Sequence, residues 1–124
     1  MQKRAFGKHW ESQAESFLRK KGLKTLVRNF TCRFGEIDLI MQDGEYLVFA
    51  EVRYRAGKQY GSGAETVTAI KQRRIIKAAS MYLLLHSEQA QRHCRFDVIS
   101  IGKSHGAQNL NWIRNAFTAD QSQY

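Results

Sequence analysis

Hydrophobic residues follow two different periods along the chain, one helical and one strand-like. The first helical segment is "HWESQAESFLRKKG", in which apolar residues at 10, 14, 17 and 18 form a stripe. Two lysines fill its last turn, and Gly22 follows as a stop signal. From Lys24 to Phe34 the chain is rich in β-forming residues and has no helical stripe, which predicts a first strand.

The strongest strand pair comes next. Residues 36–41 and 46–54 are two apolar runs joined through Asp43-Gly44, a dipeptide that favours a two-residue hairpin turn. With that turn, Ile40 is expected opposite Leu47, and Asp38 opposite Phe49.

A long second helix is expected after the hairpin, in "GSGAETVTAIKQRRIIKAASMYLLLH". Residues Ser62 to Glu65 fit a capping box. An apolar stripe follows, formed by Val67, Ile70, Ala78 and Tyr82.

The last third of the chain predicts another strand at residues 95–101 and a loop at residues 103–108. Residues 110–117 can form either a strand or a helix. The expected order is α-β-β-β-α-β, an α/β fold with a mixed sheet flanked by helices. A length of 124 residues fits a single domain, residues 1–124.

Acidic side chains lie among the most apolar residues of the hairpin. Because side chains alternate along a strand, Asp38 and Glu51 are expected on one face, roughly 7–8 Å apart at the backbone as diagonal neighbours. Arg53 shares that face. One interpretation is that each acid is paired with an arginine, but a single guanidinium is a poor match for two or three acids.

Carboxylates that share a site without counter-charge raise one another's pKa, so such a cluster favours a bound cation or a catalytic task. Oxygen ligands without a nearby histidine indicate Mg²⁺ or Mn²⁺, held by Asp38 and Glu51. Glu36, at the start of the strand, is expected to be solvated. Glu11 or Glu15, one turn apart on the first helix, can complete the set.

The motifs "GEIDLI", "LVFAEVRYR", "RFDVISI" and "IRNAF" together resemble the YraN-type family of uncharacterised bacterial proteins along about the whole chain. That family is similar in fold to restriction endonucleases and Holliday-junction resolvases, whose sites follow the PD-(D/E)xK pattern. The resemblance implies a nuclease-like site in which Asp38 matches the motif aspartate, Glu51 the second acid and Glu11 the helix carboxylate. Glu11 matches better than Glu15.

Two positions depart from this pattern. Ile37 replaces the motif proline, a harmless change at a position that only shapes the strand. Arg53 stands where the family usually has the catalytic lysine, and arginine stays protonated, so it can stabilise charge but cannot help to deprotonate water. Lys71, near the start of the second helix, is an alternative source of the amine, although a phosphate contact is its simpler role.

The charge balance favours a polyanionic partner. The chain has 20 Lys and Arg against 11 Asp and Glu, a formal net charge of +9. The residues expected to hold a nucleic-acid backbone are Arg55, Lys58, Lys71, Arg73, Arg74 and Lys77. No base-reading motif is present, so recognition of branched or structured DNA is expected, and related resolvases act as homodimers.

Three hypotheses follow. The first is a metal-dependent DNA endonuclease in which Asp38 and Glu51 hold Mg²⁺, Arg53 grips the scissile phosphate, and Glu11 binds a second metal or orders the water. The second is a nucleic-acid-binding module with a degenerate, inactive site, and the third is an interaction protein with an acidic partner. The two cysteines form no C-x-x-C pair, and the absence of a long apolar run predicts a cytoplasmic protein without membrane contact.

Overall fold

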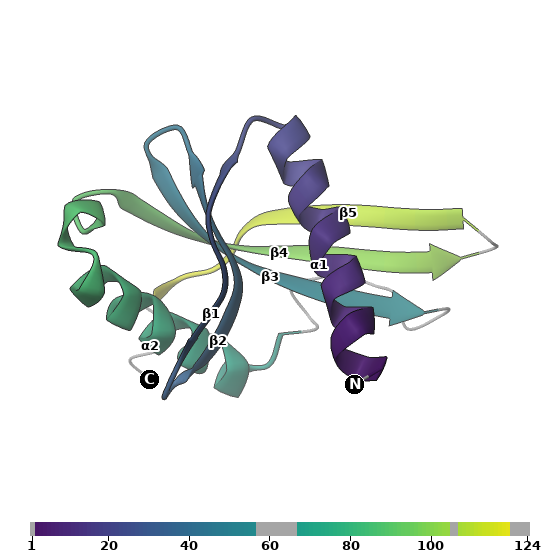
Figure 1. The fold of residues 1–124 in the computed structure, drawn as a ribbon, viewed down its shortest axis with the longest axis horizontal. Coiled ribbons are helices and arrows are strands. Elements are labelled where there is room, and N and C mark those ends of the chain that lie inside the picture. Colours follow the sequence, from purple (N-terminus) through teal and green to yellow (C-terminus); the bar gives the residue numbers. More distant parts are fainter. Residues whose placement is uncertain (1, 57–66, 105–106, 120–124) are drawn as a thin grey trace.

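The computed structural model describes residues 2–56, 67–104 and 107–119, which form an α/β fold in the order α-β-β-β-α-β-β (Figure 1). The elements are α1 (Gln2–Lys20), β1 (Lys24–Cys32), β2 (Gly35–Asp43), β3 (Tyr46–Ala56), α2 (Ala69–Leu85), the short 3-10 helix η3 (Ser87–Gln89), β4 (His93–Ser104) and β5 (Ala107–Phe117). The mixed α/β class is confirmed. Residues 110–117 are a strand, and β4 and β5 extend into the segment expected to be a loop.

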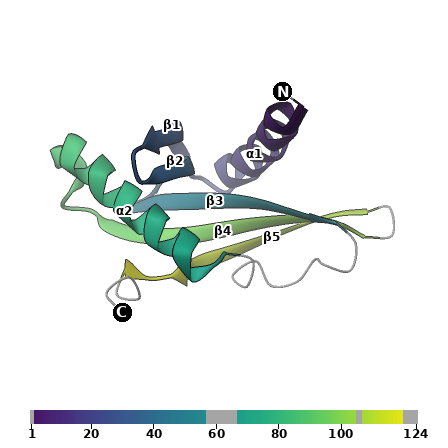
Figure 2. The same cartoon turned by 90° about the horizontal axis from the view of Figure 1, so that it is seen from below.

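The five strands form one sheet in the order β1-β2-β3-β4-β5. All neighbours are antiparallel except β3 and β4, which are parallel and therefore need a crossover connection, provided by α2. The sheet twists strongly. β1 and β2 cross the direction of β3 to β5, so Figure 2 shows the first two nearly end-on and the others along their length.

Two hydrophobic cores lie on opposite faces of this sheet. α1 packs through Ala14 and Leu18 against side chains of β2, β3 and β4 such as Leu39 and Val48. α2 packs on the other face, against alternate residues of the same strands, including Phe49. None of the helices in the described part of the chain is long and apolar enough to cross a membrane.

The register of the β2–β3 hairpin differs from the expectation by two residues. Asp43 pairs with Tyr46, so the turn is Gly44-Glu45, and Ile40 lies opposite Phe49 instead of Leu47. Gly44 has φ +59°, the left-handed conformation that a tight hairpin turn needs and that glycine adopts at low cost. A shift of two residues leaves each side chain on the same face.

The start of α2 also differs from the expectation. Thr68 is the N-cap residue, and its hydroxyl accepts a hydrogen bond from the backbone N–H of Lys71 at 3.1 Å. The expected capping box at 62–65 lies outside the described residues. The prediction that Ile70 belongs to the apolar stripe is wrong, because Ile70 is 58% exposed; Ile75 and Ile76 are buried instead.

A buried carboxylate joins the last two strands. Asp97 is fully buried and accepts hydrogen bonds from Arg95, from the indole N–H of Trp112 and from the backbone N–H of Asn115. Asn115 has φ +53° and lies at a β-bulge, where the register of β4 and β5 shifts. The backbone N–H of Asn115 has no partner in the ladder there, and the Asp97 carboxylate accepts its hydrogen bond instead.

We expect Asp97→Asn to lower the free energy of unfolding by about 3 kcal/mol, because it leaves the Arg95 guanidinium with less counter-charge in a buried place. Arg95 also contacts Asp43, whose side chain is 34% exposed. Asp43→Asn should therefore cost less than about 1 kcal/mol. Urea unfolding of both variants measures the difference, and equal losses would contradict this account of the network.

Candidate active site

The candidate site lies where β2 separates from β3. Paired positions along the hairpin end at Leu39 and Ala50, so the next residues on each strand, Asp38 and Glu51, lie just beyond the ladder. β3 continues to pair with β4 on its other side, and β2 continues to pair with β1. The sheet therefore opens at this point, and side chains from both helices can approach the gap.

Asp38 occupies this opening. Its carboxylate accepts a hydrogen bond from the backbone N–H of Val52 at 2.8 Å, in place of the ladder partner that β2 no longer provides. Burial, followed by the charge of the adjacent Glu51, raises the pKa of Asp38 well above its usual value, and the charge of Glu11 adds to this. The bond from Val52 opposes the rise but does not cancel it.

Glu11 of α1 approaches Asp38 from the opposite face of the sheet. Burial and the charge of Glu36 raise its pKa, while hydrogen bonds from Asp38 and Asn29 oppose the rise. Asn29 has φ +54° and lies between the paired positions that flank Asp38 on β1 and β2. A residue in that conformation is uncommon and is often found at functional positions.

Glu15, the other candidate on α1, is a structural acid. Its carboxylate accepts hydrogen bonds from Thr25 at 2.6 Å and from Arg28 at 2.9 Å. Burial opposes its ionisation, but these hydrogen bonds outweigh burial and lower the pKa of Glu15. The sequence left the choice between Glu11 and Glu15 open, and the structure places Glu11 with the hairpin acids.

Three carboxylates meet closely enough to share a cation. Glu11, Glu36 and Asp38 each present an oxygen atom within 4.8 Å of those of the other two. Glu36 is exposed, as expected, but its carboxylate still joins this group. This role is hard to predict from the sequence, because Glu36 is brought to Glu11 by the packing of α1 beside β2.

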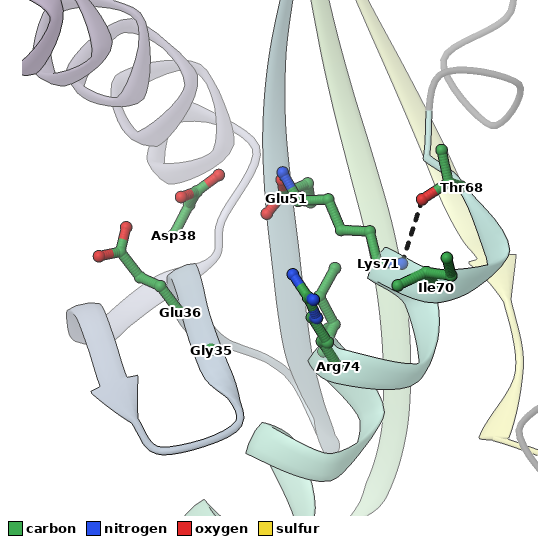
Figure 3. A pocket seen from close by; sticks show the side chains of 9 residues that line it. Gly35, Glu36, Asp38, Glu51, Thr68, Ile70, Lys71 and Arg74 are labelled. Carbon is green, nitrogen blue, oxygen red and sulfur yellow. Dashed lines mark hydrogen bonds and ion pairs between the residues drawn. The ribbon is translucent and has the colours of Figure 1, made fainter.

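Two cations of α2 face Glu36, Asp38 and Glu51 across a cavity of about 400 Å³. Lys71 extends to Glu51 and forms an ion pair with its carboxylate, while Arg74 lines the same cavity (Figure 3). Glu36 and Asp38 lie on the other side, on β2. Glu51 is only 4% exposed, so its charge is compensated mainly by Lys71. Lys71, which the sequence offers as an alternative source of the amine, is thus the basic side chain that contacts Glu51.

Arg53 shares the face of Glu51 on β3, but it is not among the residues that line this cavity. Arg55 and Arg73 are half-buried, and Lys77 is exposed with its ammonium 5.9 Å from the ring centre of Phe34. Lys58 lies outside the described residues.

Comparison with known proteins identifies the family. The model of the "Uncharacterised protein family UPF0102" matches residues 10–101. A UPF0102 protein of Stutzerimonas stutzeri is 47% identical over 111 residues, which cover 90% of this chain and 92% of the relative. Relatives from Vibrio cholerae and Nitrosococcus oceani are 46% and 44% identical, with at least 90% of each chain covered.

The chain belongs to the UPF0102 family. This confirms the resemblance to YraN-type proteins, which are the same family. The matched region of the UPF0102 chain includes Glu11, the hairpin acids and the α2 cations, so every element that forms the cavity lies within it. Its α/β architecture is consistent with a nuclease-like fold.

Removing the charge of Asp38 should stabilise the metal-free UPF0102 protein. Since the fold raises the pKa of Asp38, the folded protein retains a proton that the unfolded chain loses near pH 4. The wild type therefore loses stability as pH rises from about 4 through the raised pKa, and Asp38→Asn should not suffer this loss.

Urea unfolding in EDTA between about pH 4 and 8 tests this expectation. Glu15→Gln is the control, because its effect on the free energy of unfolding should change with pH in the opposite direction. The lowered pKa of Glu15 gives stability that is present at neutral pH and lost in acid, so Glu15→Gln should be less stable than the wild type at pH 7. If Asp38→Asn is also less stable at pH 7, repulsion among Asp38, Glu51 and Glu11 is not the dominant effect.

Proposed function

We propose that the protein is a metal-dependent endonuclease that hydrolyses phosphodiester bonds in branched or otherwise structured DNA. The observation that carries this proposal is the division of charge within one cavity, with carboxylates on the sheet side and Lys71 and Arg74 on the α2 side. A cation and a phosphate can therefore bind side by side. The proposal places the protein in the cytoplasm, with DNA as its partner and a homodimer as the form that would match a two-fold branched substrate.

The acids fit a hard divalent cation. Their donors are all carboxylate oxygens, and within the described residues no histidine or cysteine joins the group. Asp38 would hold Mg²⁺ or Mn²⁺ together with Glu51, Glu11 and Glu36 as further ligands. A divalent cation would act as a Lewis acid at the phosphate and would make a coordinated water more acidic.

The remaining residues of the site would bind and orient the DNA backbone. Arg74 is exposed and lines the cavity, so its guanidinium can form two parallel hydrogen bonds to a phosphate. Arg73 and Lys77 also lie on α2, and Arg55 lies on β3 beyond Arg53. Their contacts would be with phosphates, which position a duplex without reading its sequence.

A second candidate function is a nucleic-acid-binding module without catalysis. The observation that favours it is Arg53, which occupies the position of the motif lysine and does not line the cavity. In such a module the acids would be retained for weak metal binding. The two functions share the DNA-binding surface and differ only in cleavage.

Incubation with branched, nicked and linear DNA distinguishes these candidates. We expect cleavage of branched DNA that requires Mg²⁺ or Mn²⁺ and is abolished by Asp38→Asn and by Glu51→Gln. Glu11→Gln should lower the rate, whereas Glu15→Gln on the same helix should leave it unchanged below its unfolding temperature. Binding without cleavage of any of these DNAs would favour the binding module.

DNA binding should depend steeply on salt. Because each phosphate contact releases condensed counterions, Arg74→Ala combined with Lys77→Ala should lower the slope of log affinity against log salt by roughly one unit for each lost contact. Lys20→Ala, on α1, is the matched control and should leave the slope unchanged. Fluorescence anisotropy at salt concentrations from about 50 to about 300 mM, over which the Debye length falls roughly 2.5-fold, measures both. Salt-independent binding would favour an acidic protein as the partner instead.

A further inference from the structure

We infer that Lys71 of α2 supplies the ammonium group that β3 lacks at Arg53, and that it contacts the attacking water and the scissile phosphate during hydrolysis. This inference rests on the proposed endonuclease function and adds a catalytic residue to it. The Lys71 ammonium would occupy two positions. It contacts Glu51 before a divalent cation binds, and it would turn toward the phosphate once the cation is bound.

The placement of Lys71 is well defined by its surroundings. Its backbone N–H is held by the capping hydroxyl of Thr68, so the base of the side chain lies in the first turn of α2. Its ammonium reaches Glu51, the acid that follows the β2–β3 ladder. The Lys71 side chain is 41% exposed while that of Glu51 is 5% exposed, so the lysine reaches from the cavity mouth to a buried carboxylate.

Lys71 and Arg53 differ in both position and chemistry. Lys71 lines the cavity that contains Asp38 and Glu51, and Arg53 does not. An ammonium is a compact charge with three donors on a flexible stem, so it can contact a water and a phosphate oxygen at once. A guanidinium is a wide planar group that suits a bidentate grip on phosphate but not the space beside an attacking water.

In the protein without a bound cation, Lys71 serves as the counter-ion of Glu51. A divalent cation bound to Asp38 and Glu51 would replace that positive charge, and the ammonium would then be free to turn toward an incoming phosphate. Because the acids repel one another, a positive charge beside Glu51 is favourable whether the Lys71 ammonium or a divalent metal ion provides it. The same carboxylate can therefore pair with Lys71 in the metal-free protein and with the metal ion once that ion is bound.

The chemical step is hydrolysis of a phosphodiester bond by water, and Lys71 would assist it without taking up or losing a proton. The oxygen of water forms a bond to phosphorus, the bond from phosphorus to the leaving sugar oxygen breaks, the water proton passes to solvent, and the leaving oxygen takes a proton from solvent. Lys71 would donate hydrogen bonds to the attacking oxygen and to a non-bridging phosphate oxygen. It would thereby offset negative charge that develops as the new bond forms.

The first test separates metal binding from catalysis. Lys71→Met should bind Mn²⁺ about threefold tighter than the wild type, because the ammonium no longer competes for Glu51. The same variant should cleave branched DNA at least about 10²-fold more slowly, the usual loss on removing one charge-stabilising donor. Electron paramagnetic resonance of free Mn²⁺ measures the affinity without any turnover, and Lys20→Met should change neither quantity.

The second test restores the ammonium chemically. Lys71→Cys should be as slow as Lys71→Met, and alkylation with 2-bromoethylamine should return most of the rate by rebuilding an ammonium of similar length. The wild type, treated in parallel, controls for alkylation of Cys32 and Cys94. Lys20→Cys should cleave at the wild-type rate before and after treatment.

The outcomes distinguish the inference from the proposed function. If the wild type cleaves and Lys71→Met cleaves within a few-fold of it, Lys71 is not catalytic and the endonuclease function stands. Loss of Mn²⁺ binding in Lys71→Met, or no recovery on alkylation of Lys71→Cys, would show a structural role and overturn the inference. A wild type that cuts none of the DNAs overturns the proposed function and this assignment with it.

Discussion

Repulsion between Asp38 and Glu51 is the constraint on which the site depends. The two carboxylates are adjacent where the β2–β3 ladder ends, and the charge of Glu51 is a principal cause of the raised pKa of Asp38 after burial itself. Two like charges in such a place need a proton, a basic side chain or a metal ion between or beside them. The described residues provide one of these, the ammonium of Lys71, and it reaches only Glu51. Burial and repulsion raise the pKa values of Asp38 and Glu11, so these carboxylates hold a proton more strongly than ordinary acids do.

Glu15 and Asp97 are acids with a structural role, and their hydrogen-bond donors differ from the surroundings of the hairpin acids. Glu15 is held by Arg28 and Thr25, and its pKa is lowered. Asp97 is fully buried, yet its oxygens accept bonds from a guanidinium, an indole and a backbone N–H. Each of these acids has its donors nearby, on the same or neighbouring elements. The hairpin acids face one another instead, and that contrast supports the proposal that Asp38, and not Asp97, belongs to the functional site.

The sequence predicted most of the fold and part of the site, for a physical reason. Alternation along a strand fixes the face of each side chain, so the sequence predicts Asp38 and Glu51 on one face. The observed register differs from the prediction by two residues, and a shift of two leaves that face unchanged. Contacts between elements distant in sequence do not follow from periodicity. The sequence offers Lys71 as an alternative source of the amine, but nothing in the local pattern shows that the first turn of α2 faces Glu51. The same limit applies to Glu36, whose approach to Glu11 depends on how α1 crosses the sheet.

The site therefore joins the two faces of the sheet. Glu11 comes from α1, which packs through Ala14 and Leu18, and Lys71 comes from α2, which packs through Ile75 and Ile76. Glu11 lies beside Glu36 and Asp38 but does not line the cavity, which is formed by residues of β2, β3 and the start of α2. The two signs of charge in the cavity therefore meet only when α2 is seated on the sheet. An amine carried by β3 itself would be fixed relative to Glu51 by the strand alone. An amine carried by α2 is fixed by the packing of that helix, and the hydrophobic core on its face becomes part of the geometry of the site.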